Sequence, residues 1–232
     1  MDNVLCLACG GKSVRSYSWR SLYWKQNQGY LCQSCQSKLE KLEAPCCRKC
    51  ARMLKGVPAT FVEADLCYDC VRWEKQGSAL VQNHSLYVYN NYLKELLALF
   101  KYRGDYAIVK VFAEEIRAIL LRLRADYIIP IPLSEERLYE RRFNQSEAII
   151  SEAGFVPSSL LTRTHSEKQS KKSRHHRMNQ ATVFQMDRNF SVQNKKIILV
   201  DDIYTTGSTL QQAAEVLRRE GAKHIQSVTV AR

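Results

Sequence analysis

Two adjacent carboxylates, Asp201 and Asp202, end the most apolar stretch of the sequence, Lys196–Val200. Ile-Tyr and then a run of hydroxyl residues around one glycine follow, namely Thr205, Thr206, Gly207, Ser208 and Thr209. In open α/β sheets, ligands bind where a strand ends and the following helix begins. Backbone N–H groups at a helix N-terminus attract an anion such as phosphate, and glycine lets the backbone come close.

Carboxylates bind phosphate poorly, so we expect the two acids to serve another part of the ligand. Sugar hydroxyls and a Mg²⁺ ion are the natural candidates. A phosphate at one end and a diol at the other describe a ribose 5-phosphate. The alternative is an ordinary strand–turn–helix with a Ser/Thr cap and solvated acids, which leaves most of these residues unexplained. No Gly-x-x-x-x-Gly-Lys-[Ser/Thr] sequence occurs, which excludes a Walker A loop.

A second candidate segment, Ile129–Arg137, follows another apolar stretch. In a parallel sheet it would reach the same edge as Asp201. Ser134 and Arg137 are therefore predicted to contact a diphosphate, although a proline-bounded turn with no ligand is the competing interpretation. Asn144, further on, is typical of a helix cap.

The segment Arg163–Arg177 is strongly basic and has few apolar residues to anchor it. It could close over the site as a lid, neutralising a diphosphate and excluding water, or grip a nucleic-acid backbone. An exposed charged loop without a ligand is the third interpretation. The candidate contact residues are Lys168, Lys171, Lys172, Arg174 and Arg177. The three histidines of this stretch are expected to be surface residues.

All nine cysteines lie between Cys6 and Cys70. Eight of them form Cys-x-x-Cys pairs, each of which places two thiolates on one edge of a tetrahedron. Taken in order, the pairs predict two structural Cys₄ zinc sites with no open position for water. The ligands would be Cys6, Cys9, Cys32 and Cys35 in the first, and Cys47, Cys50, Cys67 and Cys70 in the second. Cys46 remains as a free thiol.

Disulfides and a thioredoxin-like redox centre are the rival explanations of the cysteines. A chain without a recognisable signal peptide is expected to be kept reduced, and a redox centre needs one such motif on a βα turn. Apolar runs are too short for a membrane span, so we expect a cytoplasmic protein. The net charge of +12 favours polyanionic partners, yet it is equally compatible with a solvated basic face.

Hydrophobic periodicity after the cysteines alternates between strands and helices. This pattern predicts an α/β fold with a mostly parallel sheet covered on both faces. We place a double zinc-ribbon domain at 1–73, a polar connector at 74–85 and the α/β domain at 86–232. Expected strands are Leu86–Tyr89, Asp126–Ile131, Lys196–Val200 and Ile225–Val230. One expected helix is capped by Asn90 or Asn91 and another follows Asn144; two more span about Ala107–Arg124 and Gly207–Glu220.

The segment Val200–Gly207 resembles the diphosphoribosyl-binding motif of type I phosphoribosyltransferases. That resemblance implies that Asp201 and Asp202 hold the ribose 2- and 3-hydroxyls as the catalytic acids, and that residues 205–209 hold the 5-phosphate. The whole chain is similar to the ComF family, the late-competence ComFC proteins. The similarity rests on the paired zinc ribbons and on Phe100–Asp105, Ile129–Ser134, Phe143–Gln145, Glu167–Lys172 and Val200–Gly207.

Membership of that family would imply a cytosolic role in DNA uptake during natural transformation, with single-stranded DNA, the ComFA translocase ATPase and recombination proteins as partners. It would not identify a phosphoribosyl acceptor. Two other functions remain open: a nucleobase phosphoribosyltransferase, and a non-catalytic adaptor that senses a metabolite. One departure from the family is that Arg142 stands where the ComF pattern has glycine.

Overall fold

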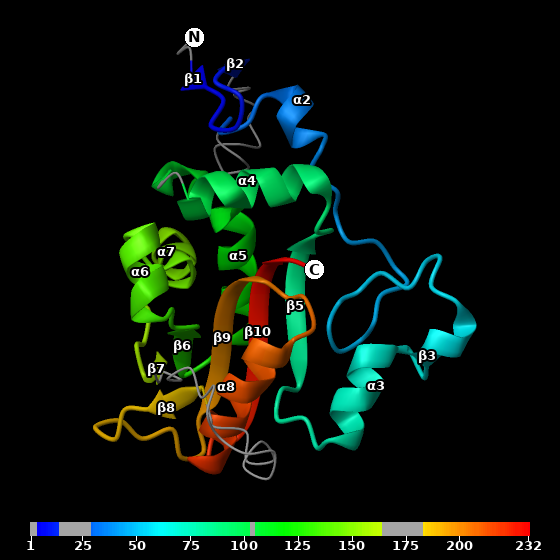
Figure 1. Cartoon of the computed structure of the whole chain (residues 1–232), viewed down its shortest axis with the longest axis vertical. Helices are drawn as coiled ribbons and strands as arrows, with labels where there is room; N and C mark the ends of the chain where they lie inside the picture. The colour runs from blue at the N-terminus through cyan, green and yellow to red at the C-terminus, as the bar shows by residue number, and fades with distance from the viewer. Residues whose placement is uncertain (1–3, 14–28, 103–104, 164–182) are drawn as a thin grey trace, which may run out of the picture.

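The computed structural model describes residues 4–13, 29–102, 105–163 and 183–232 (Figure 1). The basic candidates Lys168, Lys171, Lys172, Arg174 and Arg177 lie outside the described residues. The helices are α2 (Gln33–Gln36), α3 (Tyr68–Lys75), α4 (Asn91–Tyr102), α5 (Lys110–Leu123), α6 (Glu135–Arg141), α7 (Gln145–Glu152) and α8 (Ser208–Arg219), with 3-10 helices η1 (Ala59–Phe61) and η2 (Tyr106–Val109). The described part of the chain contains no helix with the length and apolar character that crossing a membrane requires.

The central sheet confirms the predicted fold class. Its four strands are all parallel and lie in the order β5 (Gln82–Tyr87), β10 (His224–Ala231), β9 (Lys196–Ile203) and β6 (Tyr127–Pro130). Smaller antiparallel pairs join β1 (Val4–Leu5) to β2 (Lys12–Ser13), β3 (Val62–Glu63) to β4 (Leu66–Cys67), and β7 (Leu161–Arg163) to β8 (Phe184–Met186). Parallel strands bring their carboxyl ends to one edge, so β6 and β9 deliver the two candidate segments there.

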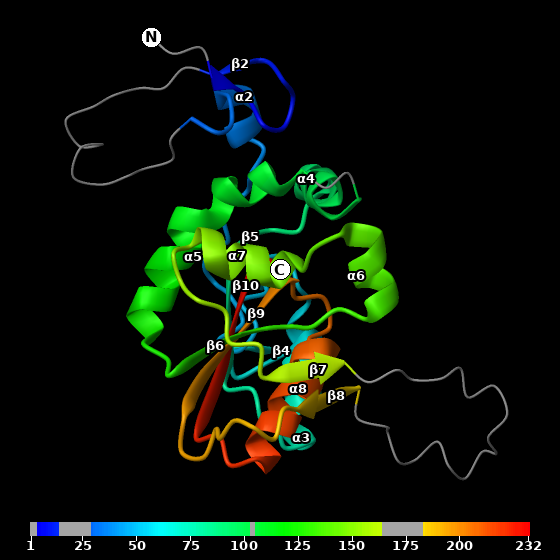
Figure 2. The ribbon, with the colours of Figure 1, turned by 90° about the vertical axis from the view of Figure 1, so that its left-hand side faces the viewer.

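Strand β9 separates two hydrophobic clusters because successive side chains of a strand point to opposite faces. Ile198 and Val200 pack in the cluster that contains residues of α4, α5 and α7. Ile197 and Leu199 pack in the other cluster, with α8. Figures 1 and 2 show α5 and α8 on opposite sides of the sheet. The sheet is therefore covered on both faces, as the apolar character of its strands predicted.

The two cysteine-rich segments pack in different clusters. Cys6 and Cys35 are buried in the cluster of α4 and α5, whereas the four cysteines from Cys47 to Cys70 are buried in that of α8. In Figure 1 the N-terminal segment lies next to α4, and α3 lies on the other side of the sheet near α8. Each segment therefore contributes apolar surface to a different face of the α/β domain.

Some element boundaries differ from the expected ones. Strand β5 begins at Gln82, inside the stretch expected to be a connector, and its polar Asn83 is buried and satisfied by Ser85 and Ser227. The helix expected from Ala107 begins as η2 and becomes α5 only at Lys110. Helix α6 replaces the turn considered after Pro132.

Arg142, in place of the family glycine, adopts the backbone conformation that glycine favours. It caps the C-terminus of α6 with φ of 69°, and its N–H donates to the carbonyl of Leu138 (2.8 Å). The guanidinium lies 4.9 Å from the centre of the Tyr139 ring, which gives this conformation a favourable contact. Arg142 therefore ends α6 in a left-handed conformation.

Candidate functional site

The candidate acids lie at the carboxyl end of the central strand β9. Asp201 is paired in register with Thr229 of β10, and Asp202 is 8% exposed. The Asp201 Oδ1 atom accepts hydrogen bonds from the Asp202 N–H (2.9 Å) and from the Ser146 hydroxyl (3.3 Å). These contacts fix the Asp201 carboxylate between β9 and the first turn of α7.

Lys101 forms an ion pair with Asp202, and both side chains are largely buried. The lysine comes from the last turn of α4, within the Phe100–Asp105 segment that marked the family resemblance. Sequence reasoning gave it no role, although its place in a shared motif was a usable signal. Its ammonium group offsets one of the two negative charges that the strand brings together.

The pKa of Asp201 is shifted toward neutrality. Burial and the neighbouring charge of Asp202 raise it from the ordinary value of 3.8 to about 7, although Lys101 and Ser146 act in the opposite direction. A carboxyl group that titrates at this pH can bind a cation or accept a hydroxyl hydrogen bond with a proton released in exchange.

The loop after β9 turns sharply into α8. Gly207 has φ of 81° and caps the helix, and a Cβ atom built on it would lie 2.1 Å from the Tyr204 hydroxyl. Only glycine fits this conformation and this contact. Thr205 and Thr206 are exposed, whereas Ser208 and Thr209 are partly buried in the first turn of α8. The N–H groups at this helix start have the polarity that attracts an anion.

The second candidate segment has a structural role as well as a position near the acids. Ser134 is the N-cap of α6, where its hydroxyl accepts from the Arg137 N–H (3.4 Å). Asn144 caps α7, as predicted, and its side-chain amide donates to the carbonyl of Ile131 (3.1 Å). This bond ties the start of α7 to the loop after β6.

Arg163 responds to the charges of two groups that the sequence assigned to the site. Burial lowers the pKa of Arg163 in β7; the charge of Arg137 lowers it further, and the charge of Asp201 opposes this. Arg163 therefore lies within range of the charges of both Arg137 and Asp201. A guanidinium group near a carboxylate suits a ligand that is itself both anionic and hydroxylated.

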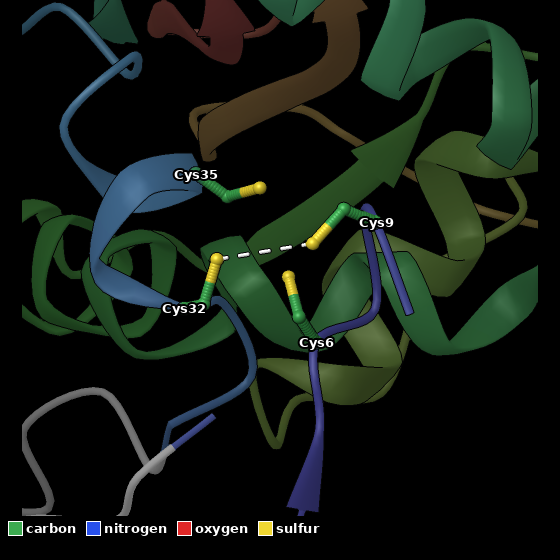
Figure 3. Close-up of side chains that lie close together, drawn as sticks. All are labelled: Cys6, Cys9, Cys32 and Cys35. Atoms are coloured by element: carbon green, nitrogen blue, oxygen red, sulfur yellow. Dashed lines mark hydrogen bonds between the residues drawn. The ribbon is translucent and has the colours of Figure 1, made fainter. Parts of the chain in front are cut away.

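The cysteines form the two groups that the spacing predicted. Among the described residues, the sulfurs within each group of four lie within 4.8 Å of one another. Figure 3 shows the first group, with all four side chains directed toward a common centre. Tetrahedral zinc with Zn–S bonds of about 2.3 Å requires sulfur separations of roughly 3.8 Å. Those of Cys9–Cys32 (3.8 Å) and Cys50–Cys67 (3.6 Å) fit this requirement.

Cys46 belongs to neither group. Its thiol donates to the carbonyl of Glu43 (3.1 Å). The second group is fully buried, whereas Cys9 of the first is exposed.

Comparisons with known proteins find a matching domain family and relatives that cover the whole chain. A phosphoribosyl transferase domain family matches residues 158–232. Competence protein ComFC of Bacillus subtilis (strain 168) is 36% identical over 240 residues, which cover 100% of this chain and 96% of that protein. Competence protein ComFC of Streptococcus pneumoniae is 31% identical, covering 98% of this chain and 99% of that one. A hypoxanthine phosphoribosyltransferase structure from Staphylococcus aureus is 18% identical, covering 53% of this chain and 62% of that chain with a TM-score of 0.33.

Proposed function

The chain belongs to the ComFC family of competence proteins, and on that premise we propose that it binds 5-phosphoribosyl 1-diphosphate with Mg²⁺ and handles single-stranded DNA during natural transformation. The single observation that carries the ligand is the acid pair at the end of β9, followed at once by the Gly207 turn and the start of α8. Anion-binding N–H groups and sugar-binding carboxylates follow each other within one segment.

Each part of the ligand has a matching group in this proposal. The 5-phosphate is bound by the N–H and hydroxyl groups of residues 205–209, and the ribose hydroxyls are bound by Asp201 and Asp202. Arg163, which responds to the charges of Asp201 and Arg137, would neutralise the diphosphate together with Arg137. Asp201 and Asp202 would also be the groups that hold Mg²⁺, which would offset the charge of the ligand.

The same arrangement would support transfer of the phosphoribosyl group if an acceptor reaches C1. As the C1–O bond to diphosphate breaks, positive charge develops on the sugar ring and negative charge on the leaving group. The protein would orient the ribose through the acid pair and stabilise the diphosphate through the two arginines. A non-catalytic adaptor would use the same contacts for binding alone, so product formation distinguishes the two.

The proposed DNA role rests on charge and on family membership. The net charge of +12 would attract a polyanion, and the basic candidates between Lys168 and Arg177 join β7 to β8 in sequence, next to Arg163. The partners expected for this role are single-stranded DNA, the ComFA translocase ATPase and recombination proteins, in the cytoplasm. We further propose that both Cys₄ groups hold zinc, since their ligand type and spacing suit it.

A calorimetric titration tests the ligand proposal. 5-Phosphoribosyl 1-diphosphate should bind with a stoichiometry of one in the presence of Mg²⁺ and much more weakly with EDTA. Parallel measurement of released diphosphate, with and without purine and pyrimidine bases, separates an enzyme from an adaptor. Absence of binding heat under both conditions would refute the assigned ligand.

Binding of single-stranded DNA is tested by fluorescence anisotropy at several salt concentrations. Charge-driven binding predicts that affinity falls steeply with salt. Replacing Lys171 and Lys172 with glutamine should weaken DNA binding, whereas the same change at the exposed Lys223 should not. Equal affinities for the two variants would contradict a role for the basic segment.

The pH dependence of ligand binding should follow Asp201. Its ionised form is the one that binds Mg²⁺ or accepts from a hydroxyl, so binding near pH 7 should release a proton. Affinity should fall about tenfold per pH unit below 7 and level off above about 8. Titrations in two buffers of different ionisation enthalpy measure the released proton. Asp201→Asn should bind more weakly and lose this part of the pH dependence. The part that arises from ionisation of the ligand's own phosphate groups should be the same in both proteins.

The same shift has a consequence for stability. Between pH 3.8 and about 7 the folded chain holds the Asp201 proton more tightly than the unfolded chain does. The contribution of Asp201 to the stability of the ligand-free protein should therefore decline as the pH rises through this range. Thermal melting of the wild type and of Asp201→Asn at both ends of the range measures the difference.

A further inference from the structure

The proposed phosphate-binding loop comprises residues 204–209. Three consecutive carbonyl groups of this loop accept hydrogen bonds from residues outside it. The Arg232 guanidinium donates to the carbonyls of Tyr204 (3.2 Å) and Thr205 (2.7 Å). The Trp73 indole N–H donates to the carbonyl of Thr206 (2.9 Å). These donors come from residues far from the loop in sequence, so the contacts are tertiary.

Fixing these carbonyls also fixes the N–H groups that a phosphate would contact. In a trans peptide the C=O of one residue and the N–H of the next point in opposite directions. The carbonyls of residues 204–206 point toward Arg232 and Trp73, so the N–H groups of Thr205, Thr206 and Gly207 point to the opposite side. Successive N–H groups held in this way form an anion-binding concavity.

Both donors are connected to the second cysteine group, Cys47, Cys50, Cys67 and Cys70. A second guanidinium nitrogen of Arg232 donates to the Cys50 sulfur (3.1 Å). Trp73 is part of α3, the helix that begins directly after Cys67 and carries Cys70. In Figure 1, α3 lies near α8, whose first turn follows the loop. Arg232 thus links a cysteine sulfur directly to the loop backbone, with one hydrogen bond to Cys50 and two to the carbonyls of Tyr204 and Thr205.

The packing around Arg232 leaves it little freedom. Its guanidinium lies 4.9 Å from the centre of the Tyr204 ring, and Tyr204 is 3% exposed. The backbone N–H of Arg232 donates to Tyr87 (3.0 Å) at the end of β5, and its carbonyl accepts from Tyr89 (3.0 Å). Arg232 is therefore held by its backbone hydrogen bonds, by the Tyr204 ring and by hydrogen bonds from both terminal guanidinium nitrogens.

We infer that the second cysteine group holds the phosphate-binding loop in its binding conformation through Arg232 and Trp73, which act as positioning residues. The identity of the ligand rests on the function proposed above, whereas the link between metal group and loop rests on the hydrogen bonds. Because coupling between two sites is reciprocal, loss of metal should weaken phosphate binding, and bound phosphate should slow the loss of metal.

Affinity for ribose 5-phosphate tests the first half of this coupling. Trp73→Phe removes one donor and keeps the ring, so affinity should fall about 3- to 10-fold. Arg232→Met removes two hydrogen bonds to the loop and one to the Cys50 sulfur, and affinity should fall about 10- to 100-fold. Arg219→Met, a matched loss of charge at an exposed position of α8, should leave affinity unchanged.

Retention of metal tests the second half independently of affinity. The zinc-loaded protein is incubated with EDTA and an alkylating reagent, and mass spectrometry follows each cysteine. Ribose 5-phosphate should slow alkylation of Cys47–Cys70 in the wild type but not in Arg232→Met, while Cys6–Cys35 serve as the internal control. Arg232→Met alone should speed alkylation of the second group about tenfold, because such outer contacts tune metal affinity.

The outcomes separate the two proposals. A wild type that fails to bind ribose 5-phosphate would refute the proposed ligand and this coupling together. Wild-type binding with unchanged affinity in both Trp73→Phe and Arg232→Met would overturn the coupling alone. So would equal protection of the second group by ligand in the wild type and in Arg232→Met.

Discussion

Replacing Asp202 with asparagine should reduce the affinity for 5-phosphoribosyl 1-diphosphate with Mg²⁺ by at least about 100-fold. Hydrogen bonds to a charged acceptor contribute about 1.5–3 kcal/mol each, and a carboxylate that binds sugar hydroxyls or a cation makes more than one such contact. Two lost contacts correspond to a factor of about 100 or more. Isothermal titration calorimetry at pH 8 gives the comparison directly.

Asp126→Asn is the matched control, because it makes the same change at an exposed acid next to the opposite end of the sheet. The Asp202 variant also leaves Lys101 without its partner, which should lower the free energy of unfolding by about 1–3 kcal/mol. Adding Lys101→Gln should recover part of that stability without recovering binding. A folded Asp202→Asn protein with wild-type affinity would exclude the acid pair from the site.

Replacing Cys67 with serine should have the largest effect on stability. Cys67 is 1% exposed, and its sulfur lies 3.6 Å from that of Cys50 in the second group. Structural zinc contributes about 10 kcal/mol or more to folding in small zinc domains. Even half of that value, about 5 kcal/mol, would lower the melting temperature of a chain of this size by about 10 °C or more.

Differential scanning calorimetry and measurement of bound zinc test this prediction together. The variant should hold about one equivalent of zinc less than the wild type. Cys46→Ser is the matched control, because Cys46 is outside both groups, and it should change the free energy of unfolding by no more than about 0.5 kcal/mol. Unchanged zinc content and melting in Cys67→Ser would show that the second group is not a metal site.

Local patterns in the sequence predicted the central elements and the candidate acids. The apolar run from Lys196 identified β9, and Leu210, Ala213, Ala214 and Leu217 at helical spacing identified α8. Strand β9 extends to Ile203 because its pairing with β10 continues to Ala231, so both acids lie within the strand rather than after it. The spacing of the cysteines likewise predicted which four form each group.

Elements without an apolar pattern were not predicted. Helix α6 buries none of its residues, so its sequence has no hydrophobic period to reveal it. The polar start of β5 resembled a connector in the sequence. The side chain of its buried Asn83 finds hydrogen-bond partners such as Ser227 only when the sheet has formed. The roles of Lys101, Trp73 and Arg232 depend on contacts with distant residues. The shared motif singled out the segment around Lys101, but no local pattern reveals which carbonyl or carboxylate a side chain will contact.

The position of β9 between two parallel neighbours has a consequence for motion. Its backbone is hydrogen-bonded along both edges, to β10 and to β6, and its side chains fill the cores on both faces. Amide protons of such a strand should be among the last to exchange with solvent. The carboxylates at its end therefore have little freedom to shift when a ligand arrives, and any closure around the bound molecule must come from segments outside the sheet.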